Sequence, residues 1–540
     1  MVKKNYSEWS KQELVEEIKK LEKRKKYGIV WEDKLEQVAE LCKEKLPVLT
    51  EDKTKEIETD KGKPVNILIE GDNYHALSVL NYTHKGQIDV IYIDPPYNTG
   101  NEGFVYNDKI IDAEDSFRHS KWLSFMNKRL KLAKGLLSEK GIFFVSIDDN
   151  EYSQLKLLCD EILGENNFIG PFIWKSKIGG GNDNKHLANE HEYILIYAKN
   201  IQKLPPLFEK QSEEYKSKFK LKDRHFQERG GYYLDSLYKS GIDSNRPNLR
   251  YSIKSPDGTE IWPPTIWRLS KTEFEKRLKN DEIIFRKDKT NSWKIMTKTY
   301  FIISGEERGK RPRSVLPLFG GTRAGNDEIK EIFGELIFKY PKNTELMKYL
   351  TYISPKGKDS IVLDFFAGTG TTGQAILELN KEDDGKRKFI LCTNNENEIC
   401  THVCYPRLNK VIKEYKLDGN LKYFRTGFVD ANPTDRNKKR LVDKSTEMLC
   451  LKEDCFDEVM KGNDFKIFSN SKGKNLGIVY EDDGIEVFKK EVKKSKRKFI
   501  VYVFSLDESA REEEFEDIKN LVELKPIPSV ILNVYKRIFK

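Results

Sequence analysis

The chain has 540 residues, 38% of them hydrophobic, so it is long enough for two or three domains and needs no disulfide staples. Its seven cysteines include no Cys-x-x-Cys pair, which is typical of free thiols in a reducing compartment, and Cys400 with Cys404 is a poor template for a zinc site. No stretch approaches the roughly 20 apolar residues of a membrane span, so a soluble cytoplasmic protein is expected.

The net charge of +9 is concentrated in one part of the chain. Residues 201–320 contain 26 Lys and Arg against 16 Asp and Glu, a net charge of +10, which leaves −1 for all other residues. A basic segment of this kind is either a solvated surface or a contact for nucleic acid. Charge alone leaves both interpretations open.

The N-terminal residues, 1–60, are expected to form a helical segment. Ser10 and Glu13 have the spacing of a capping box, and apolar residues then recur at helical spacing to about residue 26. This amphipathic helix either covers the core or mediates dimerisation.

Between residues 61 and 202, short apolar runs alternate with helical patterns, which predicts a parallel sheet with helices on both faces. In such a sheet, ligands bind at the carboxyl ends of the strands. The expected strands are 66–70, 90–93, 141–147 and 192–198, and the expected helices are 74–82, 121–137 and 152–163.

This alternation stops at about residue 203, and the segment 203–312 mixes aromatic, proline and basic residues without a clear period, which indicates an inserted domain. The second part of the core then covers 313–425, and residues 430–540 form a C-terminal domain whose role the sequence does not indicate. Expected elements after the insert are a helix over 343–352, a strand over 360–363, a helix from 373, and strands at 389–392 and 499–504.

A rigid turn, Asp94-Pro95-Pro96-Tyr97, directly follows the strand expected over 90–93. The two prolines fix φ, so backbone carbonyls and flanking side chains are held facing outward. A carboxylate and a carbonyl together can accept both hydrogens of a planar amine, and Tyr97 can stack on a base. Taken alone, these four residues could also be a stiff surface turn.

A glycine-rich turn follows the strand expected over 360–363. Gly368, Gly370 and Gly373 fit the pattern G-x-G-x-x-G, and Glu396 lies beyond the next strand, where it could bind ribose hydroxyls. The pattern suits a nicotinamide cofactor or S-adenosylmethionine, whereas no Gly-Lys-Ser/Thr follows to make a P-loop. The proline turn favours the methyl donor, because a dehydrogenase has no use for a rigid amine-binding turn.

Together the two motifs resemble the amino-methyltransferase family. In that family the glycine turn lies against the methionine part of S-adenosylmethionine, the acid after the next strand holds the ribose, and the counterpart of Asp72 contacts the adenine. Asp72 is equally suited to cap a helix. Many relatives have a Lys-Pro pair near the methionine end, whose order is reversed here in Pro341-Lys342. The resemblance thus assigns to the cofactor Asp72, Lys342, Asp364, Phe366, Ala367, Gly368, Gly370 and Glu396.

The proline turn precedes the glycine turn, with the basic insert between them, which resembles the β-class permutation. The strings 27–32, 91–101 and 189–195 resemble the modification subunits of type III restriction systems, and the resemblance covers roughly residues 10–415 outside the insert. It implies a Rossmann-like methyltransferase core with permuted motifs and a target-recognition domain in the insert. Implied partners are double-stranded DNA, a second copy in a homodimer, and a Res helicase-nuclease subunit.

The implied reaction is transfer of a methyl group to the N6 amine of an adenine flipped out of the duplex, without a metal. Asp94 and the Pro95 carbonyl would orient the amine, Pro96 would keep the turn rigid, and Tyr97 would stack on the base. Cytosine N4 is an alternative target, but such members usually carry Ser where Asp94 stands, and RNA or protein amide methyltransferases usually carry Asn. In another alternative, the chain is a DNA-recognition subunit whose methyl transfer is secondary or lost.

Overall fold

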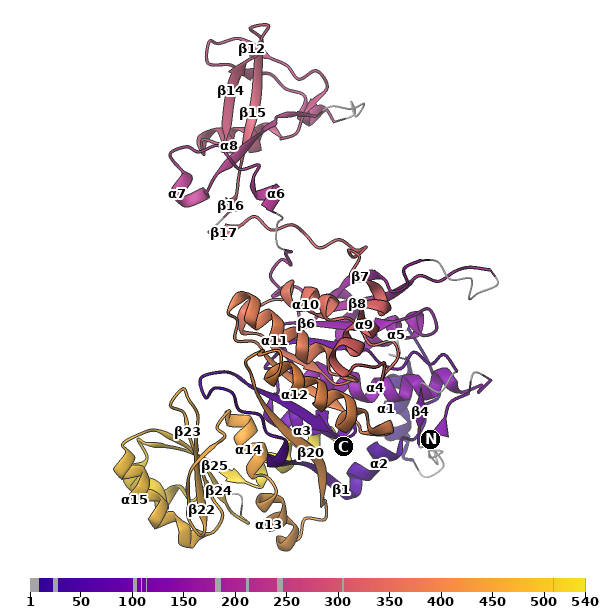
Figure 1. The fold of residues 1–540 in the computed structure, drawn as a ribbon, viewed down its shortest axis with the longest axis vertical. Helices are drawn as coiled ribbons and strands as arrows, with labels where there is room; N and C mark the ends of the chain where they lie inside the picture. Colours follow the sequence, from indigo (N-terminus) through magenta and orange to yellow (C-terminus); the bar gives the residue numbers. More distant parts are fainter. Residues whose placement is uncertain are drawn as a thin grey trace. The chain divides into compact units, whose positions relative to one another are not determined.

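The computed structural model divides the chain into two compact units, which are described separately. Residues 208–312 form the second unit, and the remainder forms the first (Figure 1). Tyr27 and Asn101, which belong to strings named above, lie outside the described residues. The structure describes residues 9–22, 28–100, 104–107, 109–112, 114–179, 186–209, 213–239, 246–303, 305–507 and 509–539.

The first unit is built around a nine-stranded sheet of order β1-β20-β2-β19-β18-β3-β6-β8-β7. The six strands from β20 to β6 are parallel, whereas β1 and β8 run antiparallel to their neighbours. The strands are β1 (Lys45–Glu51), β2 (Val65–Glu70), β3 (Ile88–Ile93), β6 (Leu137–Ile147), β7 (Phe168–Lys175), β8 (His191–Ala198), β18 (Ile361–Asp364), β19 (Lys388–Thr393) and β20 (Asn420–Asp430).

The central strands are apolar on both faces because helices cover both. Successive residues of a strand point to opposite faces. Val90 and Tyr92 of β3 therefore pack in one hydrophobic core, and Ile91 and Ile93 pack in the other. The first core contains residues of α10 (Thr344–Tyr352), α11 (Thr371–Asp383) and α12 (Tyr405–Lys413), and the second contains residues of α3 (Asn73–Thr83), α4 (Arg118–Leu136) and α5 (Tyr152–Cys159).

The sheet combines two distant parts of the chain, which appear in Figure 1 as orange elements among purple ones. Strands β18 and β19 insert between β2 and β3, with Val362 opposite Val90 and Leu363 opposite Ile91. Parallel neighbours end at the same edge of a sheet. The proline turn after β3 and the glycine turn after β18 therefore leave that edge beside each other.

Several edge features differ from the sequence-based expectation. The strand expected at 192–198 is β8, but it is antiparallel to β6, with Leu195 opposite Val145. β1 lies within the N-terminal segment expected to be helical, and β7 and β20 were not predicted. β1 contains Pro47 and β7 contains Gly170-Pro171, and proline counts against a strand unless the strand lies at a sheet edge. Both strands are indeed the two edges of the sheet.

The part of the chain that follows β20 contains a second, five-stranded sheet, which belongs to the first unit. Met448 of α14 and Tyr535 of α16 share a hydrophobic core with Leu77 and Leu80 of α3. The Tyr535 hydroxyl also donates to the carbonyl of Pro47. The elements are α13 (Asp435–Asp443), α14 (Thr446–Glu453), β21 (Asp457–Lys461), β22 (Phe465–Ser469), β23 (Asn475–Val479), α15 (Ile485–Ser495), β24 (Phe499–Phe504), β25 (Val522–Ile527) and α16 (Ser529–Ile538).

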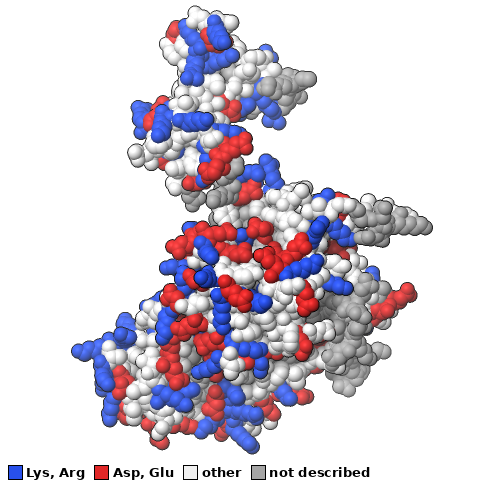
Figure 2. Space-filling model, in the orientation of Figure 1, with Lys and Arg blue, Asp and Glu red and all other residues white. Residues whose placement is uncertain are grey.

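The second unit contains a three-stranded antiparallel sheet of β14 (Ile283–Lys287), β15 (Trp293–Tyr300) and β9 (Tyr232–Ser236), with the helix α8 (Lys271–Lys279). Trp267 and Phe274 are buried in its small core. Residues 208–312 carry 24 Lys and Arg against 16 Asp and Glu, and Figure 2 shows both kinds of side chain on the face drawn. In neither unit does a described helix have the length and apolar character to cross a membrane.

Candidate active site

The proline turn is fixed to α4 by a side chain from the protein interior. Trp122, which is fully buried, donates from Nε1 to the carbonyl oxygen of Pro96 at 2.7 Å. Within the described part of the chain, no hydrogen bond reaches the carbonyl of Pro95, which lines a cavity. The turn therefore holds one carbonyl in place and leaves the preceding one available as an acceptor.

Asp94 belongs to a partly buried cluster with Tyr97, Glu192 and Lys342. The Lys342 Nζ lies 3.1 Å from Asp94 Oδ1 and 2.7 Å from Glu192 Oε2, and it donates to the Tyr97 hydroxyl at 2.8 Å. That hydroxyl lies 2.8 Å from Asp94 Oδ1 and 2.9 Å from Glu192 Oε2, so it can donate to either carboxylate. One ammonium between two carboxylates leaves the ionised cluster with a net charge of about −1.

Burial and the shared ammonium shift the pKa values of this cluster in different directions. Burial raises the pKa of Asp94, although Lys342 opposes the shift. Burial also acts to raise the pKa of Glu192, but Lys342 and Tyr97 outweigh it and the net shift is downward. Burial acts to lower the pKa of Lys342, whereas Asp94 and Glu192 produce a net rise. Lys342 thus stays charged at neutral pH, and Asp94 is the more basic of the two carboxylates.

The glycine turn is organised by Asp364, the last residue of β18. Its buried carboxylate accepts from the backbone N–H of Phe366 at 3.0 Å and from the hydroxyl of Thr372 at 2.6 Å. Burial raises the pKa of Asp364 to about 7. Gly368 and Gly370 have φ angles of +50° and +80°, a left-handed conformation that favours glycine. α11 begins immediately after Gly370.

Both turns line one cavity of about 1,150 Å³. The sequence-predicted residues in its lining are Asp72, Asp94, Pro95, Pro96, Phe366, Gly368 and Glu396. Tyr97 and Lys342 contact the Asp94 carboxylate instead of lining the cavity, and Asp364, Ala367 and Gly370 support the glycine turn. Lys342, expected near the methionine end of a cofactor, is thus placed against Asp94 and Glu192.

A wall of the same cavity is built around Arg129, which sequence reasoning did not single out. This fully buried side chain donates to Asn73 and, at 2.7 Å, to Glu36, and it lies 3.3 Å from Asp72 Oδ2. Its guanidinium lies over the Phe125 ring at 3.6 Å. Asp72 also accepts from the N–H of Tyr74 at 2.7 Å and so caps α3. The capping and cavity-lining interpretations of Asp72 are compatible.

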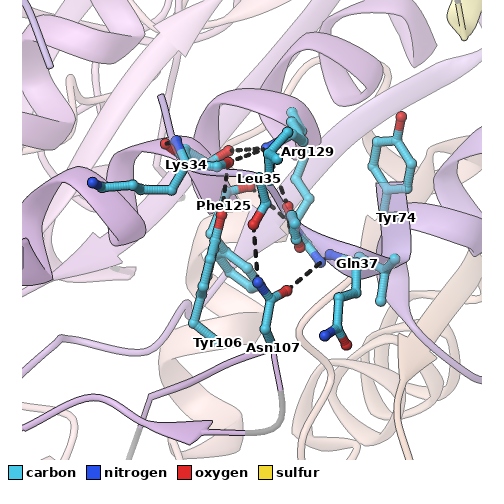
Figure 3. Close-up of polar contacts among 12 residues, drawn as sticks. Lys34, Leu35, Gln37, Tyr74, Tyr106, Asn107, Phe125 and Arg129 are labelled. Carbon is cyan, nitrogen blue, oxygen red and sulfur yellow. Dashed lines mark hydrogen bonds and ion pairs between the residues drawn. The ribbon is translucent and has the colours of Figure 1, made fainter. Parts of the chain in front are cut away.

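Figure 3 shows how the segment around Gln37 is held at this wall. The Asn107 side chain accepts from the N–H of Gln37 at 2.8 Å and donates to the carbonyl of Leu35 at 2.9 Å. The Tyr106 hydroxyl donates to the carbonyl of Lys34 at 2.8 Å. These partners are separated by about 70 residues, so no short motif could have revealed them.

Comparison with known proteins places these motifs in a family. Residues 88–403 match a family model described as DNA methylase. The type II methyltransferase M.KpnI of Klebsiella pneumoniae is 31% identical over 381 residues, which cover 67% of this chain and 88% of the relative. The StyLTI Mod subunit, from a type III restriction-modification enzyme of Salmonella typhimurium, is 34% identical over 378 residues, or 65% of this chain and 56% of the relative. The predicted similarity to type III modification subunits is therefore confirmed.

The EcoP15I Mod subunit of Escherichia coli, also from a type III enzyme, is 32% identical over 64% of this chain and 60% of the relative. The chain thus spans little more than half the length of the type III relatives it matches. A solved structure of PvuII DNA methyltransferase, cytosine-N4-specific, aligns with a TM-score of 0.33 and 11% identity, covering 67% of this chain and 98% of that one. The family model spans both turns, M.KpnI is covered over 88% of its length, and the chain belongs to the DNA methylase family.

Proposed function

We propose that this chain transfers a methyl group from S-adenosylmethionine to the N6 amine of adenine in double-stranded DNA. The observation that carries the proposal is the single cavity lined by both Asp94-Pro95 and the glycine turn. An amine bound at Asp94-Pro95 and a methyl donor bound at the glycine turn would therefore lie in the same cavity. Proximity of this kind converts a bimolecular reaction into one within a complex.

The cavity lining fits S-adenosylmethionine in size and chemistry. About 1,150 Å³ exceeds the roughly 300–1,000 Å³ of common ligand pockets, which leaves room for a base beside the donor. Asp72 and Glu396 offer carboxylates for hydroxyl and ammonium groups, and Phe366 and Phe125 offer aromatic surface. When bound, the cofactor would supply an electrophilic methyl group.

The protein's own contribution is to orient the amine and to take up a proton. Asp94 and the free carbonyl of Pro95 can each accept one amine hydrogen, which aims the nitrogen lone pair away from the turn. As the new N–C bond formed and the sulfur–methyl bond of the donor broke, the amine would lose a proton. Asp94 can receive it, because burial has raised its pKa and the Tyr97 hydroxyl connects it to Glu192.

Recognition of DNA is assigned to the second unit, whose Lys and Arg residues exceed its Asp and Glu. Binding to phosphates releases counterions, so affinity should fall steeply with salt. The base would leave the stack to reach the cavity. Cytosine N4 remains the second candidate target, and Asp94 favours adenine over it. With DNA as substrate, we expect the protein to act in the cytoplasm.

We further propose that the chain is the modification subunit of a type III system, acting as a homodimer and supplying recognition to a Res helicase-nuclease. Its similarity to the StyLTI and EcoP15I Mod subunits supports this role. The 88% coverage of M.KpnI supports the alternative of a type II methyltransferase. Co-purification with a Res subunit would distinguish the two.

The decisive experiment is tritium transfer from labelled S-adenosylmethionine to unmethylated DNA, with the product digested to nucleosides. Label in N6-methyladenine is expected for the wild type. Label in N4-methylcytosine would show that the target base is cytosine and not adenine. No transfer by a folded protein that binds DNA would contradict the enzymatic proposal and favour a recognition subunit.

A further inference from the structure

A second buried cluster lies at the downstream end of the proline turn. Asn98, directly after Tyr97, is only 2% exposed, and its side-chain amide donates to Glu151 Oε1 at 2.5 Å. Glu151 follows β6 and has no exposed surface. His119, on the first turn of α4, contacts the same Glu151 oxygen through Nδ1 at 2.6 Å.

This arrangement is costly for the fold. Burial raises the pKa of Glu151, against the opposing effect of Asn98 and His119. Glu151 Oε2 and Asn98 Oδ1 are also buried, and neither has a hydrogen-bond partner in the part of the chain that the structure describes. A buried carboxylate with an unmatched oxygen destabilises a protein unless its other contacts offset the loss of hydration. Stability alone therefore does not account for a glutamate here.

The backbone at Asn98 gives a second reason to regard the contact as specific. Asn98 has a φ of +55°, a left-handed conformation that asparagine tolerates better than most residues. This left-handed residue directly follows the proline turn, at the point where the Glu151 contact is made. The Asp94 end is held by Lys342 and the middle by Trp122, so Glu151 supplies the remaining anchor.

We propose that Glu151 is a positioning residue for methyl transfer, acting through Asn98 to keep the proline turn in the conformation that presents Asp94 and the Pro95 carbonyl. The proposal rests on the function proposed above. His119 contacts Glu151 from the side that is open to solvent, since 39% of the His119 side chain is exposed.

An exchange of the two partners tests the proposal. Asn98→Asp tolerates the left-handed backbone but places a second carboxylate against Glu151, and we expect kcat to fall about 100-fold, as for a misplaced reacting group. Glu151→Gln should lower kcat about tenfold, because a neutral acceptor holds Asn98 less firmly. In the double variant, the new amide at position 151 can donate to the new carboxylate at position 98, and kcat should return to within about tenfold of the wild type.

Two further readouts separate positioning from a general loss of stability. The KM for S-adenosylmethionine should change less than about threefold, because the glycine turn belongs to a different strand. Hydrogen exchange of the peptide over 92–100 should accelerate in each single variant and slow again in the double variant. Asn98→Gly keeps the left-handed backbone without the amide, so it should show the same faster exchange.

Single variants with wild-type kcat and unchanged exchange would overturn the proposal, as would a double variant no better than Asn98→Asp. A wild type that transfers no methyl group would contradict the proposed function. The exchange measurement would still decide in that case whether Glu151 holds the turn.

Discussion

The proline turn after β3 and the glycine turn after β18 leave the same edge of the sheet, but different forces hold them. Side chains from distant parts of the chain, Lys342 and Trp122 among them, fix the proline turn. The glycine turn depends on backbone bonds, such as Ala367 N–H to Cys392 O at 3.1 Å, on its own Asp364, and on the buried Arg407, which donates to the hydroxyls of Thr369 and Thr371 at 3.2 and 2.8 Å. The proline turn, which must orient a reacting group, is therefore held partly by an ion pair from a distant part of the chain. The glycine turn, which must leave room for a ligand, is held by hydrogen bonds to its own hydroxyl and backbone groups and by left-handed glycines.

Removing the ion pairs of Lys342 should have the largest effect on stability. Lys342→Met would leave Asp94 and Glu192 as two partly buried carboxylates without their cation, and we expect the unfolding free energy to drop by about 2–4 kcal/mol. Urea denaturation at pH 7.5 measures the loss. Lys348→Met is a matched control, because that lysine pairs with Glu345 and Glu382 near the surface and should cost about 1 kcal/mol or less. Similar losses for both variants would show that the ion pairs of Lys342 stabilise the fold no more than a surface ion pair does.

The next largest effect is expected on the rate of methyl transfer, from a change in the proline turn that leaves the glycine turn intact. Asp94→Asn keeps the shape of the side chain but donates where the carboxylate accepts, so kcat should fall about 10²–10³-fold. The affinity for S-adenosylmethionine, measured by calorimetry, should stay within about threefold. A large loss of affinity with an unaffected kcat would reverse the roles assigned to the two turns.

A smaller effect should come from the glycine turn. A Cβ at Gly370 would meet Cys404 Sγ at 3.0 Å, and its φ of +80° is unfavourable for alanine, so Gly370→Ala should cost about 2–3 kcal/mol. Gly334→Ala is the matched control, since Gly334 has a φ of +83° and a Cβ there would meet no atom within 4 Å. Thermal unfolding with and without S-adenosylmethionine compares them. Equal shifts would show that only backbone conformation, and not the packing on Cys404, matters.

The most gradual effect is the pH dependence of Asp364. Its folded pKa is about 7 against an ordinary value of 3.8, so between these values the folded protein keeps a proton that the unfolded chain releases. Stability from this group is therefore greatest at low pH and declines towards pH 7, by up to about 1.4 kcal/mol per pH unit. Asp364→Asn should flatten that decline in urea titrations from pH 5 to 8. An unchanged slope would show that Asp364 titrates normally.

Both turns and their strands could be predicted because each is a short local pattern. Their adjacency is instead a result of the strand order, in which β18 lies next to β3. Arg129 and Glu192 could not be found in this way, because each acquires its role from partners elsewhere in the chain. The direction of β8 was missed for a related reason. An apolar strand such as Ile194–Ala198 has the same composition whichever way it runs.

The interleaving of β18 and β19 between β2 and β3 has a consequence for biosynthesis. When β3 emerges from the ribosome, the strand that will lie on one side of it has not yet been made. At elongation rates of roughly 5–20 residues per second, the interval between Asp94 and Asp364 lasts on the order of tens of seconds. During that time β2 and β3 are open strand edges, which are templates for aggregation. Expression at lower temperature or with added chaperones should therefore increase the yield of folded protein.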